Sequence, residues 1–250
     1  MVLRLGLLCL IPFSDALTQS AAPVGQARPV AQLSRFPADK AVRLMRERLP
    51  CAGCHTFAGG GGRVGPDLSR VADRRTASYV RRMIEDPQGT VPGTPMPKVP
   101  MPSATRALII AYLTARAVHN DAAQSAPPTL ARDASRTDAG TSAPLLYRRY
   151  CAACHGSAGR GDGPNARFLP VRPAVHADAA YMSARSDDRL FDAIYAGGYP
   201  LGRSVTMPPF GETLSRSEIW SLVRHLRQLC RCVGPAWSVQ PRQRAPGRSP

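Results

Sequence analysis

The chain contains one pentapeptide pattern twice, as CAGCH from Cys51 to His55 and as CAACH from Cys151 to His155. The two residues between the cysteines set their sulfurs the distance apart of a porphyrin's two vinyl groups, and the histidine that follows can ligate the iron. The pattern therefore predicts two covalently attached haem c groups. The attachment residues are Cys51, Cys54, Cys151 and Cys154, and the first axial ligands are His55 and His155.

Two other uses of paired cysteines fit less well. A thioredoxin-like dithiol has no need of the histidine that follows. A structural zinc site collects four ligands from paired CxxC motifs or from CxxC together with HxxxH. Here each CxxC has its own histidine, and the sequence contains neither HxxxH nor a third CxxC. Structural zinc is the main alternative to haem.

Length and composition favour two small modules. The 250 residues are too many for one haem-binding core of the usual small size, and the two motifs lie one hundred positions apart. Hydrophobic residues make up 44% of the chain, which supports globular cores, while 25 Pro and 21 Gly predict many loops. No segment approaches the roughly twenty consecutive apolar residues of a membrane span. We expect each module to bury one haem.

Helical patterns surround both motifs in the same order. The first half predicts helices at 38–49, from a Thr76 cap to Pro87, and at about 104–118. In the second half, LLYRRY leads into CAACH, and Ser186 caps a helix that stops at Gly197. A last helix opens at Ser215, where Glu218 completes an SxxE capping box. The order helix, CxxCH, loop, helix, Met-Pro loop, helix occurs twice and indicates internal duplication.

The N-terminus predicts export. Arg4 precedes a short apolar stretch from Leu5 to Phe13, with cleavage expected after Ala16 or Ala21; a mis-assigned start or a disordered leader is the alternative. Because covalent haem attachment takes place outside the bacterial inner membrane or in an equivalent compartment, we expect a periplasmic location. The predicted divisions are a leader at 1–35, haem modules at 36–118 and 144–233, a linker at 119–143 and a disordered tail at 234–250.

Both halves resemble class I c-type cytochrome domains, and the whole chain resembles the di-haem, two-domain periplasmic cytochromes c. The resemblance covers about residues 38–118 and 144–232. It rests on CAGCHTFAGGGGRVGPDL and PGTPMPKVPM in the first half, and on CAACHGSAGRGDGP and MPPFGETLSRSEIWSLVRHL in the second. It implies an all-α fold of two tandem helical bundles, each around one covalent haem. It also implies a distal methionine ligand in each half, Met96 and Met207.

A histidine and a methionine on one iron favour the ferrous state and leave no vacancy for a substrate, so the expected role is electron transfer. Met207 precedes two prolines that stiffen its loop, and no other methionine competes with it nearby. Met101 lies five residues after Met96 in the same Pro-rich loop and is the alternative ligand there. Met182 is expected to pack in the core.

The proximal imidazoles need a hydrogen-bond acceptor for their other nitrogen. In the family a proline carbonyl serves, so the resemblance assigns Pro66 in the first half and either Pro164 or Pro170 in the second. His176 lies in a loop without ligand spacing. His225 is expected to pack between helices rather than to bind iron.

The chain is strongly basic, with a net charge of +16, and all but two of its 33 basic residues are arginines. The arginines are spread along the chain without a recognition helix or a stacking motif, which argues against nucleic-acid binding. We expect the positive surface to steer docking to an acidic redox partner or an anionic membrane. A merely solvated basic surface is the alternative.

The sequence thus predicts a non-enzymatic di-haem electron carrier, diffusible or docked as the electron-transfer subunit of a dehydrogenase or respiratory complex. The alternative is a di-haem oxidoreductase such as a cytochrome c peroxidase or a thiosulfate dehydrogenase. A methionine candidate in each half argues against an open iron. Cys230 and Cys232 are left without a role and could pair with each other, bridge to another chain or stay as thiols.

Overall fold

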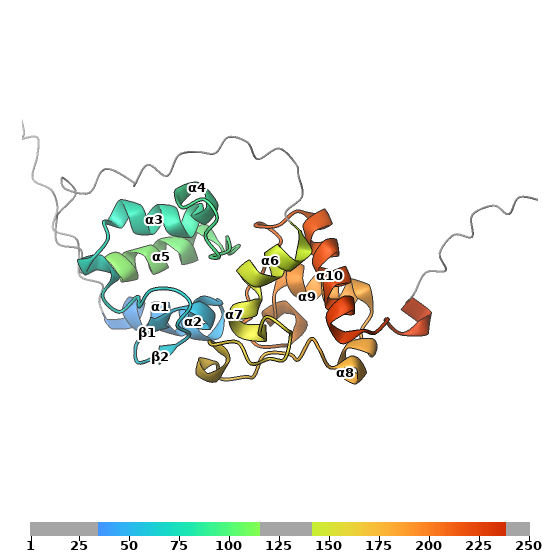
Figure 1. Cartoon of the computed structure of the whole chain (residues 1–250). Coiled ribbons are helices and arrows are strands. Elements are labelled where there is room, and N and C mark those ends of the chain that lie inside the picture. The colour runs from blue at the N-terminus through green and yellow to red at the C-terminus, as the bar shows by residue number, and fades with distance from the viewer. Residues whose placement is uncertain (1–34, 116–141, 239–250) are drawn as a thin grey trace, which may run out of the picture. The chain divides into compact units, whose positions relative to one another are not determined.

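Helices dominate the computed structural model, which describes residues 35–115 and 142–238 (Figure 1). In this part of the chain the strands are one antiparallel pair, β1 (Thr56–Phe57) and β2 (Gly60–Gly61). The described residues leave out 1–34 of the predicted leader, 116–118 at the end of the predicted first module, 119–141 of the predicted linker and 239–250 of the predicted tail. The mostly helical content agrees with the predicted all-α class.

The first half places its helices around the CAGCH motif. Thr76 caps α3 as predicted, since its side chain accepts a hydrogen bond from the Tyr79 N–H. α5 packs against both α1 and α3, and Figure 1 shows α3 and α5 side by side. The helices are α1 (Arg35–Glu47), α2 (Cys51–Cys54), α3 (Ala77–Glu85), α4 (Pro87–Thr90) and α5 (Ser103–Thr114), with a 3-10 turn η1 (Val71–Asp73).

One apolar cluster fills this half. The helices contribute side chains spaced three and four apart, which share one face. Met45 and Phe57 are almost completely buried, so Phe57 has a core position. The buried members are Ala41, Met45, Leu49, Phe57, Val71, Val80, Ile109 and Leu113.

The second half also places its helices around its CxxCH motif. Ser186 caps α9, which ends at Gly197, where a φ of +77° suits glycine. Ser215 and Glu218 form the predicted capping box of α10. The helices are α6 (Ala143–Tyr150), α7 (Ala152–His155), α8 (Ala179–Ser183), α9 (Asp187–Ala196) and α10 (Arg216–Cys230). The 3-10 turns are η2 (Ala166–Phe168), η3 (Tyr199–Leu201) and η4 (Ala236–Ser238).

A second apolar cluster fills this half. α10 packs against α6 and α9 and contributes the predicted stripe, which includes Ile219, Leu222 and Val223. Met182 is also buried, as predicted. The cluster consists of Leu146, Tyr147, Met182, Leu190, Phe191, Ile194, Phe210, Leu214, Ile219, Leu222, Val223, Leu226 and Cys230.

The ends of the predicted modules differ slightly from the structure. α1 begins at Arg35, three residues before the predicted helix, and α6 begins at Ala143, the last residue of the predicted linker. The predicted tail includes η4. Helix ends depend on capping and packing, so such offsets of a few residues are expected from a periodicity argument.

Candidate functional site

The two CxxCH motifs fold alike. In each, the backbone N–H of the histidine donates to the carbonyl of the first cysteine at 2.9 Å, His55 to Cys51 and His155 to Cys151. The motif is therefore one helical turn. Because residues three and four apart on a helix share a face, both thiols and the imidazole emerge on the same side. This is the arrangement that attachment to one flat macrocycle requires.

In both halves a backbone carbonyl orients the imidazole. His55 Nδ1 donates to the Pro66 carbonyl at 2.8 Å, which confirms the prediction for the first half. His155 Nδ1 donates instead to the Ala174 carbonyl at 2.9 Å. The predictions of Pro164 and Pro170 were wrong. The N–H groups of Gly163 and Asn165, on either side of Pro164, donate to carbonyls of α7. The chain then turns through η2, and the loop reaches the imidazole of His155 only at Ala174.

Burial favours the neutral form of both imidazoles. Burial lowers the pKa of His55 and of His155, more than their hydrogen bonds to carbonyls raise it. Since Nδ1 carries the proton that each ring donates, Nε2 has the free lone pair. A neutral imidazole with a free Nε2 is the form that binds iron.

Gly65 packs directly against the imidazole of His55. A Cβ at this position would lie 2.3 Å from His55 Cε1 and 2.5 Å from Nδ1. The ring is also hydrogen bonded to the neighbouring Pro66 carbonyl, so it cannot easily move aside. Glycine at this position therefore fixes where the imidazole lies.

All four motif thiols have raised pKa values. Burial raises the pKa of Cys51, Cys54 and Cys151 to about 12 each, and it also raises the pKa of Cys154. Redox dithiols have the opposite property, a lowered pKa. The motif cysteines thus lack the usual property of a thioredoxin-like pair. Within the described residues, no cluster of three or more His, Cys, Asp or Glu side chains is arranged to hold a metal ion.

The second half contains a cavity of about 460 Å³ beside its motif. Cys151, Cys154 and His155 lie on its wall, and so does Met207, the predicted distal ligand. Phe210 lines it as well, with its ring 5.5 Å from that of Tyr150. The apolar wall also includes Leu169, Val171, Leu190, Ile194, Leu201, Leu222 and Leu226. The volume lies within the range of cofactor sites, about 300–1,000 Å³.

The loop that carries Met207 is tied to the end of α9. The Gly198 N–H donates to the Met207 carbonyl at 3.0 Å, and the Phe210 N–H donates to the Ile194 carbonyl at 3.0 Å. A Cβ on Gly198 would meet the Ser204 carbonyl oxygen at 2.2 Å. The position of Met207 thus depends on a close backbone approach at Gly198.

In the first half, Met96 and Met101 have different surroundings. Met101 packs against the apolar cluster, whereas Met96 is not among the residues that do so. The backbone of Met96 is held by Gln88 Nε2, which donates to its carbonyl at 3.1 Å. Met96 is therefore the methionine whose side chain is not engaged in the apolar cluster. Its role as the distal iron ligand stays a prediction. A cavity of about 460 Å³ in this half is lined by other residues and contains none of CAGCH.

His176 was not predicted to lie at the site. Its ring stacks on that of His155, with centroids 4.1 Å apart and planes 15° apart. The Tyr147 hydroxyl hydrogen bonds to His176 Nδ1 at 3.0 Å, and the ring of His225 packs edge-on against Tyr147. His225 therefore packs between helices, as predicted. No spacing in the sequence indicates the stacking, because it depends on how the loop after α7 folds back.

Asn165 links the two motif loops, and all described residues belong to one compact unit. Its side-chain Nδ2 donates to the Gly53 carbonyl at 2.8 Å and to Cys154 Sγ at 3.2 Å, while Oδ1 accepts from the Arg63 N–H at 2.8 Å. The Asn165 side chain is only 3% exposed. This buried amide thereby joins backbone of CAGCH to a thiol of CAACH.

Comparison with known proteins gives one match. A family model described as "Cytochrome C oxidase, cbb3-type, subunit III" matches residues 138–226, about a third of the chain. No similar protein was found among curated proteins or among solved structures. None of the helices within residues 35–115 and 142–238 has the length and apolarity to cross a membrane. The match supports a c-type cytochrome domain in the second half of the chain, that is, a haem protein that transfers electrons.

Proposed function

We propose that the chain is a periplasmic di-haem c-type cytochrome that carries electrons between redox proteins. It acts either as a diffusible carrier or as the electron-transfer subunit of a dehydrogenase or respiratory complex. The observation that carries this proposal is that Cys151, Cys154, His155 and Met207 all line one cavity of about 460 Å³. When bound there, haem iron supplies one-electron redox chemistry between its ferric and ferrous states.

The donors in this cavity suit a covalent haem. Cys151 and Cys154 are the thiols that would become thioethers, and the neutral imidazole of His155 presents Nε2 to a metal. Met207 would add a soft thioether sulfur, which favours ferrous iron. If His155 and Met207 both bound the iron, the protein would leave no position there for a substrate. This supports an electron carrier over a peroxidase or a thiosulfate dehydrogenase.

The charged lining also suits a porphyrin, which has two carboxylates. Four arginines line the cavity, and Asp178 is the one acidic residue among the lining residues. Guanidinium groups bind carboxylates through paired hydrogen bonds. The arginines are Arg172, Arg185, Arg189 and Arg203.

We extend the proposal to the first half because its motif has the same local geometry. Its helical turn and its imidazole hydrogen bond to Pro66 match those of the second half. The first apolar cluster belongs entirely to the proposed domain at 36–118 and the second to the proposed domain at 144–233, so each proposed domain has its own apolar cluster within one compact unit. Met96 is the proposed sixth ligand of the first haem.

The proposed partners are a donor and an acceptor protein with acidic surfaces, or a membrane-bound complex. The support is the net charge of +16 and exposed arginines such as Arg81 and Arg82 on α3. Opposite charges accelerate protein association, and salt weakens the effect. We expect electron-transfer rates with an acidic partner to fall as ionic strength rises; rates that do not respond to salt would contradict this part.

Mass spectrometry and optical spectra of the exported protein test the function. We expect two added macrocycles and two low-spin haems with the weak red band of ferric methionine ligation. Replacing Met96 and Met207 by alanine should remove this band in two steps, while Met101→Ala should leave it. Fewer than two macrocycles would refute the di-haem proposal. A high-spin haem with rapid peroxide turnover would favour the oxidoreductase alternative.

A further inference from the structure

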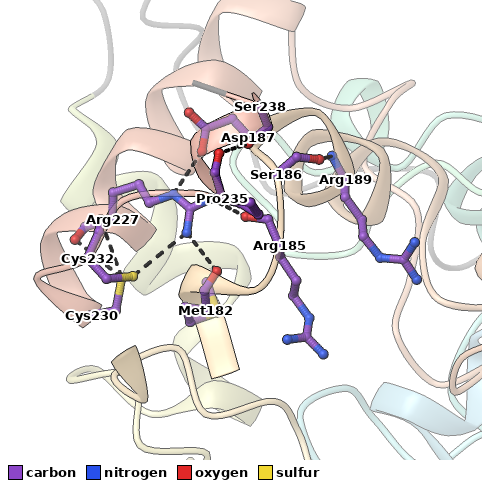
Figure 2. Close-up of polar contacts among 10 residues, drawn as sticks. All are labelled: Met182, Arg185, Ser186, Asp187, Arg189, Arg227, Cys230, Cys232, Pro235 and Ser238. Carbon is purple, nitrogen blue, oxygen red and sulfur yellow. Dashed lines mark hydrogen bonds and ion pairs between the residues drawn. A yellow bond between two sulfur atoms is a disulfide. The ribbon is translucent and has the colours of Figure 1, made fainter. Parts of the chain in front are cut away.

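A disulfide closes the C-terminal end of α10. Cys230, the last residue of the helix, is bonded to Cys232, with the Cα atoms 5.2 Å apart (Figure 2). The stabilisation that a disulfide provides by restricting the unfolded chain falls as the closed loop shortens. A sequence separation of 2 is close to the shortest loop possible. This bond therefore contributes little to the stability of the fold.

The two sulfurs have different surroundings. Cys230 is 4% exposed, and its Sγ lies 3.4 Å from the Arg227 carbonyl, an acceptor that suits a protonated thiol. Cys232 is half-buried, and its Sγ lies 3.7 Å from the Arg227 guanidinium. A cation next to a sulfur stabilises the thiolate, which is the reactive form. Cys232 is thus suited to be the accessible sulfur that exchanges with another thiol, and Cys230 to be its buried partner.

The fold holds the Arg227 guanidinium in this place. Its Nη1 donates to the Met182 carbonyl at 2.8 Å, and its Nη2 donates to the Arg185 carbonyl (Figure 2). Its Nε pairs with the Asp187 carboxylate at 2.8 Å, which offsets part of the charge. The side chain is only 12% exposed. Because these contacts do not involve the sulfurs, the rest of the fold holds the cation beside Cys232.

Exposed apolar side chains follow the disulfide. Val233 is 72% exposed, and Trp237, in η4, is 80% exposed, the largest fraction among the large hydrophobic residues in the described part of the chain. Trp237 follows Cys232 by five residues, and an exposed tryptophan offers apolar contact to a polypeptide. A small thiol would gain much less from this contact.

We propose that Cys230 and Cys232 form a thiol–disulfide exchange site that oxidises two cysteines of another polypeptide. A thiolate of that polypeptide attacks Cys232 Sγ. The Cys230–Cys232 bond breaks, a mixed disulfide forms at Cys232, and Cys230 leaves as a thiolate that takes up a proton. The second thiolate of the polypeptide then attacks its own sulfur in the mixed disulfide, and Cys232 leaves as a thiolate beside Arg227.

The polypeptide loses two electrons and two protons and gains a disulfide, while the Cys230–Cys232 pair gains the two electrons. No step depends on haem, so the exchange site and the proposed electron-transfer function stand or fall separately.

The first test exposes the folded full-length protein to dithiothreitol, followed by quenching, alkylation and mass spectrometry of the peptide that contains Cys230 and Cys232. We expect the pair to be reduced while the protein remains folded by circular dichroism. Reduction that occurs only together with unfolding would overturn the proposal. In the same spectra, the peptides with Cys51, Cys54, Cys151 and Cys154 report haem attachment. The experiment therefore distinguishes failure of the exchange proposal from failure of the di-haem proposal.

Variants test the assigned roles of the two sulfurs. Cys230→Ser should trap a stable mixed disulfide between Cys232 and a synthetic peptide that carries one activated disulfide. Cys232→Ser should trap at least tenfold less, because Cys230 is buried. Equal trapping by both variants would overturn the assignment of Cys232 as the attacked sulfur.

Two further variants test Arg227 and Trp237. Arg227→Gln should slow exchange with a reduced two-cysteine peptide about threefold, because a tenfold loss of Cys232 thiolate stability changes the rate by about its square root. Arg224 is exposed on the same helix, so Arg224→Gln is the control and should leave the rate unchanged. Trp237→Ala should slow reaction with a reduced two-cysteine peptide about threefold and leave the dithiothreitol rate unchanged. Equal rates for Trp237→Ala and the unaltered protein with both reductants would overturn a polypeptide substrate.

Discussion

Gly198→Ala tests how the Met207 loop is held. The backbone of Gly198, with φ −78° and ψ −34°, is one that alanine adopts readily, so the substitution adds no backbone strain. The added Cβ would lie 2.2 Å from the Ser204 carbonyl oxygen and 3.1 Å from Met207 Cβ, whereas ordinary contacts begin at 3.4 Å. The loop between Ser204 and Met207 must therefore move by about 1 Å to relieve the overlap.

The expected cost follows from this overlap. Overpacking of this kind destabilises proteins by about 1–3 kcal/mol, and we expect about 2 kcal/mol here because the clashing atom belongs to the backbone. Because an iron ligand is sensitive to small displacements, the methionine band of the second haem should also weaken or disappear. Chemical denaturation measures the first effect, and the optical spectrum of the oxidised protein measures the second.

Gly202→Ala in the same loop is the matched control. Gly202 has a φ of +65°, but a Cβ there would meet nothing within 4 Å. Gly202→Ala should lower the free energy of unfolding by about 1 kcal/mol, because alanine disfavours the left-handed backbone, and it should leave the methionine band unchanged. If Gly198→Ala retained full stability and the band, or if both variants lost the band alike, the close approach at Gly198 would not be what positions Met207.

Three further predictions concern other contacts. Tyr147→Phe leaves His176 Nδ1 without its hydroxyl partner and should lower the free energy of unfolding by about 1–3 kcal/mol, measured by urea denaturation. Ser215→Ala removes the capping box of α10 and should cost about 1 kcal/mol in the same assay, with the spectrum unchanged; a spectral change would contradict a purely local effect. Gly65→Ala should displace the His55 imidazole and reduce haem attachment at CAGCH, as seen in the mass of that peptide, while attachment at CAACH stays normal.

Local features of the fold were predictable from the sequence. The caps at Thr76, Ser186 and Ser215 form as expected, because a cap depends on a side chain and a backbone N–H three residues apart. The apolar stripe of α10 is buried for a similar reason, since helical periodicity alone decides which side chains share a face. The short strands β1 and β2 were not predicted, because two-residue strands in a glycine-rich loop leave no periodic signal.

The candidate site was predictable only in part. The CxxCH spacing indicates the thiols and the proximal histidines, and the Pro66 carbonyl follows from family resemblance and is found at 2.8 Å from His55. The equivalent acceptor in the second half is Ala174, and neither of the predicted prolines accepts. A carbonyl carries no side-chain signature, so its role depends on where the loop returns to the imidazole.

The sequence by itself determined the two attachment motifs, the helices around them and the basic charge, because these depend on residue type and short spacing. Only the tertiary structure decided that His176 stacks on His155, that Asn165 joins the two motif loops and that Arg227 lies beside Cys232. Asn165 and the Gly53 carbonyl are 112 positions apart. Such contacts form where folding brings distant segments together, and the burial of many apolar side chains, rather than any local spacing, selects that arrangement.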